Sequence, residues 1–368
     1  MSEDSSINTI GIVGGGTAGY LTALAFRKFR PELKVTLIES DKVPIIGVGE
    51  ATTPNIVKFL HKVLGIDIKE FYHEVKPTHK QGIRFEWGSP DKSYFNYTFE
   101  RQDSYGGYYI HNNVSSSNLQ SVLMDQNKSF IFKNGLGESA IQAISGHLNY
   151  AYHLDNELLI AFLKKKAIEG GTILVNKKII NVIKSSNEQL IDHLIDEDQA
   201  CFSFDLYVDC SGFKSLLLEQ AMGSKYVDYS KSLFTNSAIV TNIKNPSQIK
   251  SYTTASTMKN GWLWDIPLRD KNSLGYVYSS SFCSEDEAFS ELKNKIPHVD
   301  DSYRTVKFRS GRHEECFKGN VVAFGNSYAF VEPLESSGVH MIIAGIQILM
   351  DKFPKTLSDH DSIYAINK

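Results

Sequence analysis

The chain has 368 residues, of which 42% are hydrophobic and 22% are charged, and its formal net charge is −3 at pH 7. This length is sufficient for one large domain or two intertwined domains whose core needs no disulfide or metal for support. The balanced charge gives no indication of a nucleic-acid-binding surface or an acidic tail, so nucleic acid is not expected as a partner.

The four cysteines show no C-x-x-C spacing, so a zinc site or a redox pair is not expected. Each is predicted to be a reduced, buried, small apolar side chain; they are Cys201, Cys210, Cys283 and Cys316. The polar, acidic N-terminus shows no signal-peptide pattern. The longest apolar run, residues 341–350, is too short to span a bilayer. A soluble, cytoplasmic protein with no metal site and no membrane partner is therefore expected.

The first 39 residues predict a βαβ unit. Residues 8–13 should form a buried strand, residues 20–29 a helix with one apolar face, and residues 34–39 a second strand. Gly14, Gly16 and Gly19 between the first strand and the helix match G-x-G-x-x-G, a turn that lets a helix N-terminus face a pyrophosphate. Glu39 follows Gly19 by twenty positions, where an acid suits ribose hydroxyls. Together these features predict a dinucleotide site.

Further α/β elements follow at intervals. Asp155 should cap a helix over residues 156–169, which Gly170 and Gly171 end. The remaining predicted core elements are strands at 172–175, 206–209 and 320–324 and an apolar helix that starts near residue 338 and ends before Pro354. Two aromatic-rich, strand-like stretches, about 81–149 and 233–282, separate these pieces.

This order predicts an α/β fold of mixed α+β character, with a Rossmann-like FAD core and a β-rich layer over the substrate. The core is assigned to residues 1–79, 150–220 and 305–353, and the insertions to 80–149 and 221–304. FAD is favoured over NAD because the single glycine motif is N-terminal and Gly325-Asn326 resembles a second flavin-contacting segment, where Asp is more usual. Since no second dinucleotide motif is visible, a separate flavin reductase is expected to supply reduced flavin.

Three segments carry candidate chemistry, each with a simpler interpretation. On a strand, Trp262 and Trp264 would face the same side together with Ile266, which is also the pattern of an ordinary core stripe. Lys80, taken alone, is expected to be a solvated surface lysine. The segment Glu335-Ser336-Ser337-Gly338 could simply start a helix, or its amides could hold an anion.

Seven motifs in order resemble the flavin-dependent halogenases of the tryptophan-halogenase branch, over about residues 10–354. They are GGGTAG, GVGEATTPN, THKQGIRF, AYHLD, DCSGF, GWLWDIP and VEPLESSG. GWLWDIP is the most specific and the opening glycines are the least. The resemblance implies an enzyme that uses reduced FAD, oxygen and chloride, bromide or iodide to form hypohalous acid and to halogenate an electron-rich indole, pyrrole or phenol.

The resemblance also implies cofactor and halide contacts. Residues 46–54 would form a strap over the flavin, and the backbone amides of Ser337 and Gly338 would hold the halide. The full set implied to contact FAD is Gly14, Gly16, Thr17, Ala18, Gly19, Glu39, Gly49, Glu50, Ala51, Ile179, Gly325, Leu334 and Val339.

For the reaction itself, the resemblance implies that Lys80 takes up hypohalous acid by a hydrogen bond or as a haloamine. Glu335 would polarise the halogen or remove the arene proton. The wall between flavin and substrate would consist of Trp262, Trp264, Ile266 and Pro267. A closed path ending at a lysine would restrain an otherwise indiscriminate oxidant, and a nearby carboxylate would tune that lysine.

Three departures from the family pattern bear on the substrate. The chain ends soon after the helix that follows Gly338, so the groups that clamp the amino and carboxylate groups of free tryptophan have no visible counterpart. A larger or tethered substrate, or an inactive product, becomes plausible, and a homo-oligomer could cover the end. Ser337 stands where the family usually has threonine. The segment Tyr94–Phe99 could supply arene-stacking walls or be an ordinary strand.

Other functions remain open at this point. A flavin monooxygenase shares the fold and cofactor but needs neither Lys80, Glu335 nor the tryptophan pair. A non-catalytic FAD-binding remnant would retain flavin without halide-dependent turnover. An NAD-dependent dehydrogenase has the least support, because no proton-relay group stands out beside the glycine motif.

Overall fold

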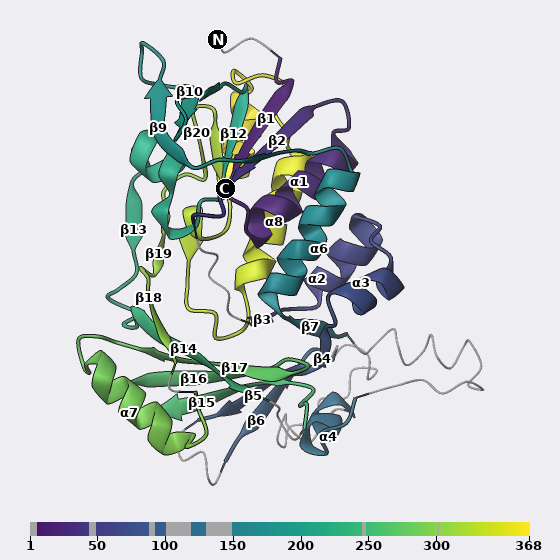
Figure 1. The fold of residues 1–368 in the computed structure, drawn as a ribbon, viewed down its shortest axis with the longest axis vertical. Helices are drawn as coiled ribbons and strands as arrows, with labels where there is room; N and C mark the ends of the chain where they lie inside the picture. The colour runs from purple at the N-terminus through teal and green to yellow at the C-terminus, as the bar shows by residue number, and fades with distance from the viewer. Residues whose placement is uncertain are drawn as a thin grey trace, which may run out of the picture.

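The structure is a computed structural model that describes residues 6–43, 49–87, 93–100, 119–129, 149–244, 248–300 and 302–368. Figure 1 shows an upper half with helices beside a sheet and a broad, mainly antiparallel sheet across the bottom, with a small sheet between them. The predicted α/β fold of mixed character is confirmed.

Six strands of the described residues form the sheet of the upper half, in the order β20-β21-β12-β1-β2-β8. Their bounds are β1 Thr9–Val13, β2 Lys34–Glu39, β8 Ile173–Asn176, β12 Leu206–Asp209, β20 Phe317–Lys318 and β21 Val321–Ala323. All neighbours are parallel except β20 and β21. The carboxyl ends of the parallel strands therefore meet at one edge, which is where open α/β sheets bind ligands.

Three helices pack together beside this sheet in Figure 1: α1 Thr17–Phe29, α6 Asn156–Glu169 and α8 Gly338–Asp351. Asp155 caps α6, as predicted, because its side chain accepts hydrogen bonds from Glu157 N and Leu158 N. The sequence predictions for β1, α1, β2, α6, β12 and α8 are confirmed to within three residues at each end. Smaller helices are α2 Asn55–Val57, α3 Ile68–Glu74, α9 His360–Asn367, two π-helices (Lys58–Val63 and Leu216–Ala221) and two 3-10 helices (Gly212–Lys214 and Gly325–Ser327).

The lower half is a sheet to which seven described strands contribute, in the order β18-β14-β17-β16-β15-β5-β6. The bounds are β5 Gly82–Glu86, β6 Phe95–Thr98, β14 Ser237–Lys244, β15 Thr253–Met258, β16 Gly261–Pro267, β17 Lys271–Tyr278 and β18 Arg304–Lys307. The strand-rich character of residues 233–282 is thus confirmed. Within 81–149, the described residues hold β5, β6 and α4 Leu119–Asp125; most of the others lie outside the described residues.

Both faces of the lower sheet are covered. One face packs Leu263, Leu274 and Tyr276 against α7 Glu285–Lys295. The other face packs Trp262 and Val277 with side chains from the upper half, and these partners are Phe213, Phe330 and Leu334. The face of the lower sheet that carries the tryptophans therefore packs against the upper half.

The small sheet between the halves has the order β3-β7-β4, with bounds β3 Glu50–Ala51, β7 Ala151–Leu154 and β4 Thr78–Lys80. In Figure 1 it lies where the upper helices meet the lower sheet. Lys80 is the last residue of β4, so this sheet holds it at the junction of the two halves. The division into an FAD core and two insertions stays a prediction.

Two further sheets of three described strands complete the fold. They are β11-β10-β9 (Cys201–Phe202, Ile191–Asp196, Ile179–Lys184) and β13-β19-β22 (Tyr226–Asp228, Gly311–His313, Ala329–Phe330). The prediction that every cysteine is buried is wrong for Cys201, which is exposed because β11 is an edge strand; the other three are buried and all four are free. Among the described residues, no helix combines the length and apolar content that crossing a bilayer requires.

Candidate active site

The glycine turn after β1 is built by close backbone approaches. A Cβ atom at Gly14, whose φ is +124°, would lie 2.1 Å from the carbonyl oxygen of Cys210, and one at Gly19 would lie 1.9 Å from Gly14 O. A Cβ at Gly16 would meet no atom within 4 Å. Gly14 and Gly19 are therefore required by the fold, whereas Gly16 leaves open space beside the N-terminus of α1, as a cradle for a phosphate requires.

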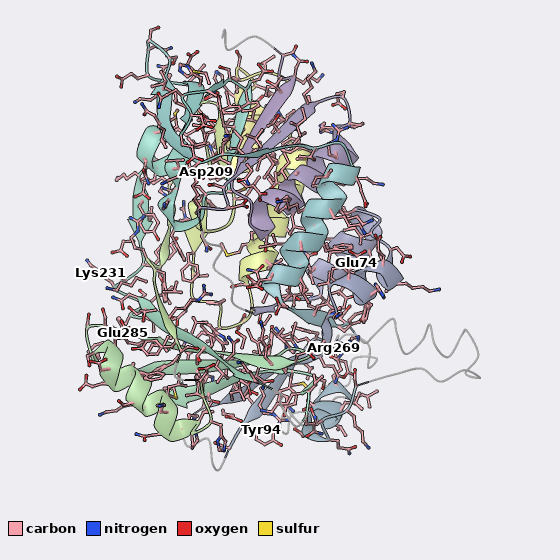
Figure 2. All side chains as sticks on the ribbon, viewed as in Figure 1. Glu74, Tyr94, Asp209, Lys231, Arg269 and Glu285 are labelled. Atoms are coloured by element: carbon pink, nitrogen blue, oxygen red, sulfur yellow. The ribbon has the colours of Figure 1, made fainter. Side chains whose placement is uncertain are left out.

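The strand beside this turn is anchored by Asp209, which Figure 2 labels in the upper half. Its carboxylate accepts hydrogen bonds from Leu217 N at 2.7 Å and Leu218 N at 2.9 Å, and also from Ser211 N at 3.0 Å. These bonds fix the turn after β12 that carries Cys210. The backbone against which Gly14 packs is thus held in place by hydrogen bonds.

Glu39, predicted to contact ribose, ends β2 and lies over the glycine turn: a Cβ at Gly15 would be 2.1 Å from its Oε2. Tyr20 donates its hydroxyl to Oε2 at 2.6 Å, and Lys164 Nζ lies 2.6 Å from Oε1. Burial and this carboxylate raise the pKa of Tyr20 far above its usual value, so its proton stays in the hydrogen bond. Tyr20 and Lys164, which the sequence reasoning missed, hold the acid in place.

Gly325 brings the second predicted cofactor segment to the same place. It has a φ of +63°, and a Cβ there would contact Ala18 at 3.3 Å and Ile342 of α8 at 3.4 Å. The starts of α1 and α8 therefore converge on Gly325. Ile179 packs in one cluster with Val13 and Ile38, beside the strands that lead into the turn. The open space at Gly16, the two helix starts and the held acid fit an FAD molecule.

Lys80 is fully buried, so the prediction of a solvated surface lysine is wrong. Its Nζ donates to Thr52 O at 2.9 Å and lies 2.6 Å from Ser336 Oγ, and the Phe99 ring centroid is 5.3 Å away. Within the described residues no carboxylate forms an ion pair with it. Burial lowers its pKa well below the usual value for a lysine, so the amine loses its proton more readily than a solvated lysine does.

The segment predicted to bind halide starts α8. Ser337 occupies the N-cap position and Gly338 is the first helical residue. The first N–H groups of a helix lack partners within it, so they can bind an anion. Ser336, one residue earlier, is buried and has a φ of +61°, a left-handed conformation that is uncommon for serine and typical of functional sites. The side chain of Glu335 is exposed.

The two tryptophans of β16 face the same side, as predicted. Their ring centroids are 6.1 Å apart, and both pack in the cluster that includes Leu334. Trp262 Nε1 donates to Glu332 Oε2 at 2.7 Å, whereas Trp264 Nε1 is buried without a partner among the described residues. Ile266 and Pro267 are also buried.

The predicted flavin strap is described only from Gly49 onward, and its residues 46–48 lie outside the described residues. Gly49 N donates to Ser273 Oγ of the lower sheet at 3.1 Å. Glu50 and Ala51 form β3, paired with Leu154 and His153. Burial raises the pKa of Glu50 to about 7. Val339, the last predicted flavin contact, is buried in the upper core.

A buried histidine that sequence reasoning missed links the small sheet to the lower sheet. His153 Nδ1 lies 3.0 Å from Thr78 Oγ1, which donates to Pro267 O at 2.6 Å. His153 Nε2 lies 3.0 Å from Thr253 Oγ1. Since the Thr78 hydroxyl proton goes to the carbonyl, His153 Nδ1 carries the proton. Burial lowers the pKa of His153 well below its usual value. The strand that ends in Lys80 is thereby fastened to β15 and β16.

The model of the tryptophan halogenase family matches residues 9–368 of this chain. Tryptophan 7-halogenase RebH of Lentzea aerocolonigenes is 33% identical over 95% of this chain and 70% of its own length. Tryptophan 6-halogenase ThaL of Streptomyces albogriseolus is 31% identical over 99% of this chain and 73% of its own length.

Solved structures agree. That of MibH, described as a lathipeptide tryptophan 5-halogenase, superposes with a TM-score of 0.87 at 41% identity and covers 100% of this chain and 71% of MibH. That of Xcc4156, a flavin-dependent halogenase from Xanthomonas campestris, gives a TM-score of 0.89 at 30% identity, over 99% of this chain and 74% of its own.

Proposed function

Because the chain belongs to the tryptophan halogenase family and is therefore a flavin-dependent halogenase, we propose that it halogenates the indole ring of tryptophan through the buried amine of Lys80. The observation that carries the proposal is the position of Lys80, fully buried at the junction of the halves and in contact with the turn that starts α8. A lysine with no carboxylate partner among the described residues has no evident structural reason to be buried there.

The cofactor of the family would lie along the glycine turn, with its pyrophosphate at the start of α1 and its ribose at Glu39. The open space at Gly16 supports this placement. When bound, reduced flavin together with oxygen would supply the oxidant that converts a halide ion to hypohalous acid. As the family's flavin is used reduced, a separate reductase is the proposed source of electrons.

The halide would be held by the backbone N–H groups of Ser337 and Gly338. These groups stand at a helix N-terminus, where the helix dipole favours an anion. Ser336 precedes these two residues in the chain, and its side chain contacts Lys80. One serine therefore links the proposed halide site to the amine. This proximity gives the oxidised halogen a short path to Lys80.

A neutral Lys80 amine has two N–H donors and one lone pair. The donors can serve Thr52 O and Ser336 Oγ, which leaves the lone pair for the electrophilic halogen. Two mechanisms are open to this amine. In the first, the amine accepts a hydrogen bond from hypohalous acid and orients it toward the substrate. In the other, amine and hypohalous acid give a haloamine and water; the haloamine then passes its halogen to the arene and regains the arene proton. Glu335 remains the candidate that carries this proton, and Trp262 with Trp264 would separate flavin from substrate.

For the substrate, we propose a tryptophan held within a peptide. The identity of 41% with MibH over the whole chain exceeds the 33% and 31% with RebH and ThaL. The name of MibH places its tryptophan in a peptide context, whereas the other two are named for tryptophan alone. An indole is also among the most electron-rich rings in proteins and suits an electrophilic halogen.

The test is mass spectrometry of products after incubation with FAD, NADH, a generic flavin reductase, oxygen and bromide. Free L-tryptophan and a tryptophan-containing peptide are compared at equal concentration. We expect a bromine isotope pattern on the peptide and at least tenfold less product from the free amino acid. Bromination of the free amino acid alone would overturn the peptide proposal, and an oxygenated product without bromine would favour a monooxygenase.

A further inference from the structure

The loop from Glu332 to Gly338, here called the halide loop, contacts the layers beneath it through alternate residues. Glu332 accepts a hydrogen bond from Trp262, Leu334 packs into the tryptophan cluster, and Ser336 contacts Lys80. Glu335, between the last two, is exposed. The loop is therefore fastened at three points along one side.

The first of these points involves only one of the two tryptophans. Trp262 is 7% exposed, and its Nε1–H donates to the carboxylate of Glu332 at 2.7 Å, across 70 positions of the chain. Trp264, two residues along the same strand face, has no partner for its Nε1 among the described residues. A hydrogen bond to a carboxylate is stronger than one between neutral groups, and breaking it in a buried site leaves both partners unsatisfied.

The halide loop is stiff between its anchors. Leu334 N donates to Glu332 O and Ser336 N donates to Pro333 O, both at 2.9 Å. Ser336 then takes its left-handed conformation, and α8 starts immediately afterwards. A displacement of Glu332 is thus transmitted through two tight turns to Ser336 and the following amides.

From these contacts we propose that Trp262 is a positioning residue for the halide site, acting through the hydrogen bond from its indole to Glu332. This bond sets where the amides of Ser337 and Gly338 stand relative to the Lys80 amine. The role is additional to that of a wall between flavin and substrate, since a wall needs only the ring. The inference rests on the proposed function for its kinetic consequences, but not for the contact itself.

Four variants separate the bond from the ring and from the charge. Trp262→Phe keeps an aromatic ring and removes the N–H; Glu332→Ala removes the acceptor; Glu332→Gln keeps an acceptor oxygen without the charge. Trp87→Phe is the matched control, because Trp87 packs in the same cluster and no hydrogen bond of its indole is recorded in the described structure. Urea unfolding of each variant checks that the fold is retained.

The contact is measured without turnover. The chain has three tryptophans, so a protein labelled with 15N-tryptophan gives three indole N–H signals, which the Trp→Phe variants assign. We expect Glu332→Ala to shift the Trp262 signal and leave the Trp87 signal unchanged. Bromide affinity, measured from the bromide-dependent rise in melting temperature, should fall about tenfold in Trp262→Phe and Glu332→Ala and stay within about twofold in Glu332→Gln and Trp87→Phe.

In turnover, the first two variants should raise the KM for bromide about tenfold with a smaller change in kcat, and should release more free hypohalous acid to a scavenger. The double variant Trp262→Phe/Glu332→Ala should be no worse than either single variant. Additive losses, or unchanged bromide affinity in Trp262→Phe with the fold retained, would overturn the positioning role. Absence of halogenation by the unmodified protein, with these binding results intact, would overturn the proposed function instead.

Discussion

Lys80 and Ser336 are 256 positions apart in the chain, yet Lys80 Nζ lies 2.6 Å from Ser336 Oγ. The contact joins the small sheet between the two halves to the turn that starts α8. Among the described residues, Ser336 is the only one whose polar side chain is recorded to contact the Lys80 amine. It directly precedes Ser337 and Gly338, whose amides are proposed to hold the halide. The catalytic proposal therefore depends on a serine as well as on a lysine.

Ser336→Ala and Ser336→Gly should both lower kcat for halogenation by about tenfold, because each leaves the Lys80 amine with one hydrogen-bond partner. The two should differ in stability. Glycine adopts a φ of +61° without strain, so the glycine variant should be more stable than the alanine variant by ~1 kcal/mol. Urea unfolding measures the difference in stability, and steady-state kinetics measure kcat. An unchanged kcat in both variants would show that the Ser336 hydroxyl has no role in turnover.

Lys80→Met should change how stability depends on pH. The pKa of Lys80 lies well below its ordinary 10.5 in the folded protein, so between the two values the unfolded chain binds more protons. Hence the free energy of unfolding of the native protein rises with pH across that window, by at most about 1.4 kcal/mol per pH unit from this group. The variant lacks this contribution. Its stability relative to the native protein should fall as pH rises through the window, and a pH-independent difference would show that Lys80 keeps an ordinary pKa.

Gly16→Ala and Gly19→Ala should separate cofactor binding from folding. A Cβ at Gly16 meets nothing within 4 Å, and the backbone there is extended, so this variant should keep the melting temperature of the apoprotein. It should nevertheless lose FAD affinity at least tenfold, because the methyl group enters the proposed phosphate cradle. Gly19→Ala should be destabilised by ~2 kcal/mol or more, since its Cβ would lie 1.9 Å from Gly14 O. If Gly16→Ala and the native protein bind FAD with equal affinity, the pyrophosphate does not lie at Gly16.

Glu50→Gln should stabilise the protein at neutral and higher pH. Burial raises the pKa of Glu50 from 4.5 to about 7, so the native fold disfavours the carboxylate. Stability from this group is fully present below pH 4.5 and is lost as pH rises through 7. The variant should therefore match the native protein near pH 5 and exceed it by about 2 kcal/mol near pH 8. Thermal or urea unfolding at both pH values decides it, and a constant offset would contradict the raised pKa of Glu50.

The sequence alone predicted what depends on local pattern. The strand–glycine turn–helix opening, the Asp155 cap and the same-side arrangement of Trp262 and Trp264 follow from residue spacing within one element. Motif resemblance supplied the candidate residues before any contact was known. Both kinds of inference need only neighbouring positions in the chain.

What the sequence could not predict depends on contacts between distant segments. Lys80 looked solvated because a lone lysine carries no sign of the sheet that buries it. The same holds for the hydrogen bond from Trp262 to Glu332, and for His153, whose partners lie 75 and 100 positions away. Cys201 looked buried because an edge strand cannot be distinguished from an inner one by a two-residue pattern. For His153 the available signal was its place within the AYHLD motif, which marks the residue but not its partners.

The role of Lys80 is tested by comparing native protein with Lys80→Met in one assay that contains a flavin reductase, NADH, FAD, oxygen, bromide and a tryptophan-containing peptide. The assay records brominated product, free hypohalous acid and NADH consumed. FAD titration confirms that both proteins bind the cofactor. The variant should keep forming hypohalous acid, which appears in solution, while the amount of brominated peptide falls by about a hundredfold or more. Brominated peptide at the native rate from Lys80→Met would show that the halogen reaches the indole without this lysine, and would rule out the proposed role of Lys80.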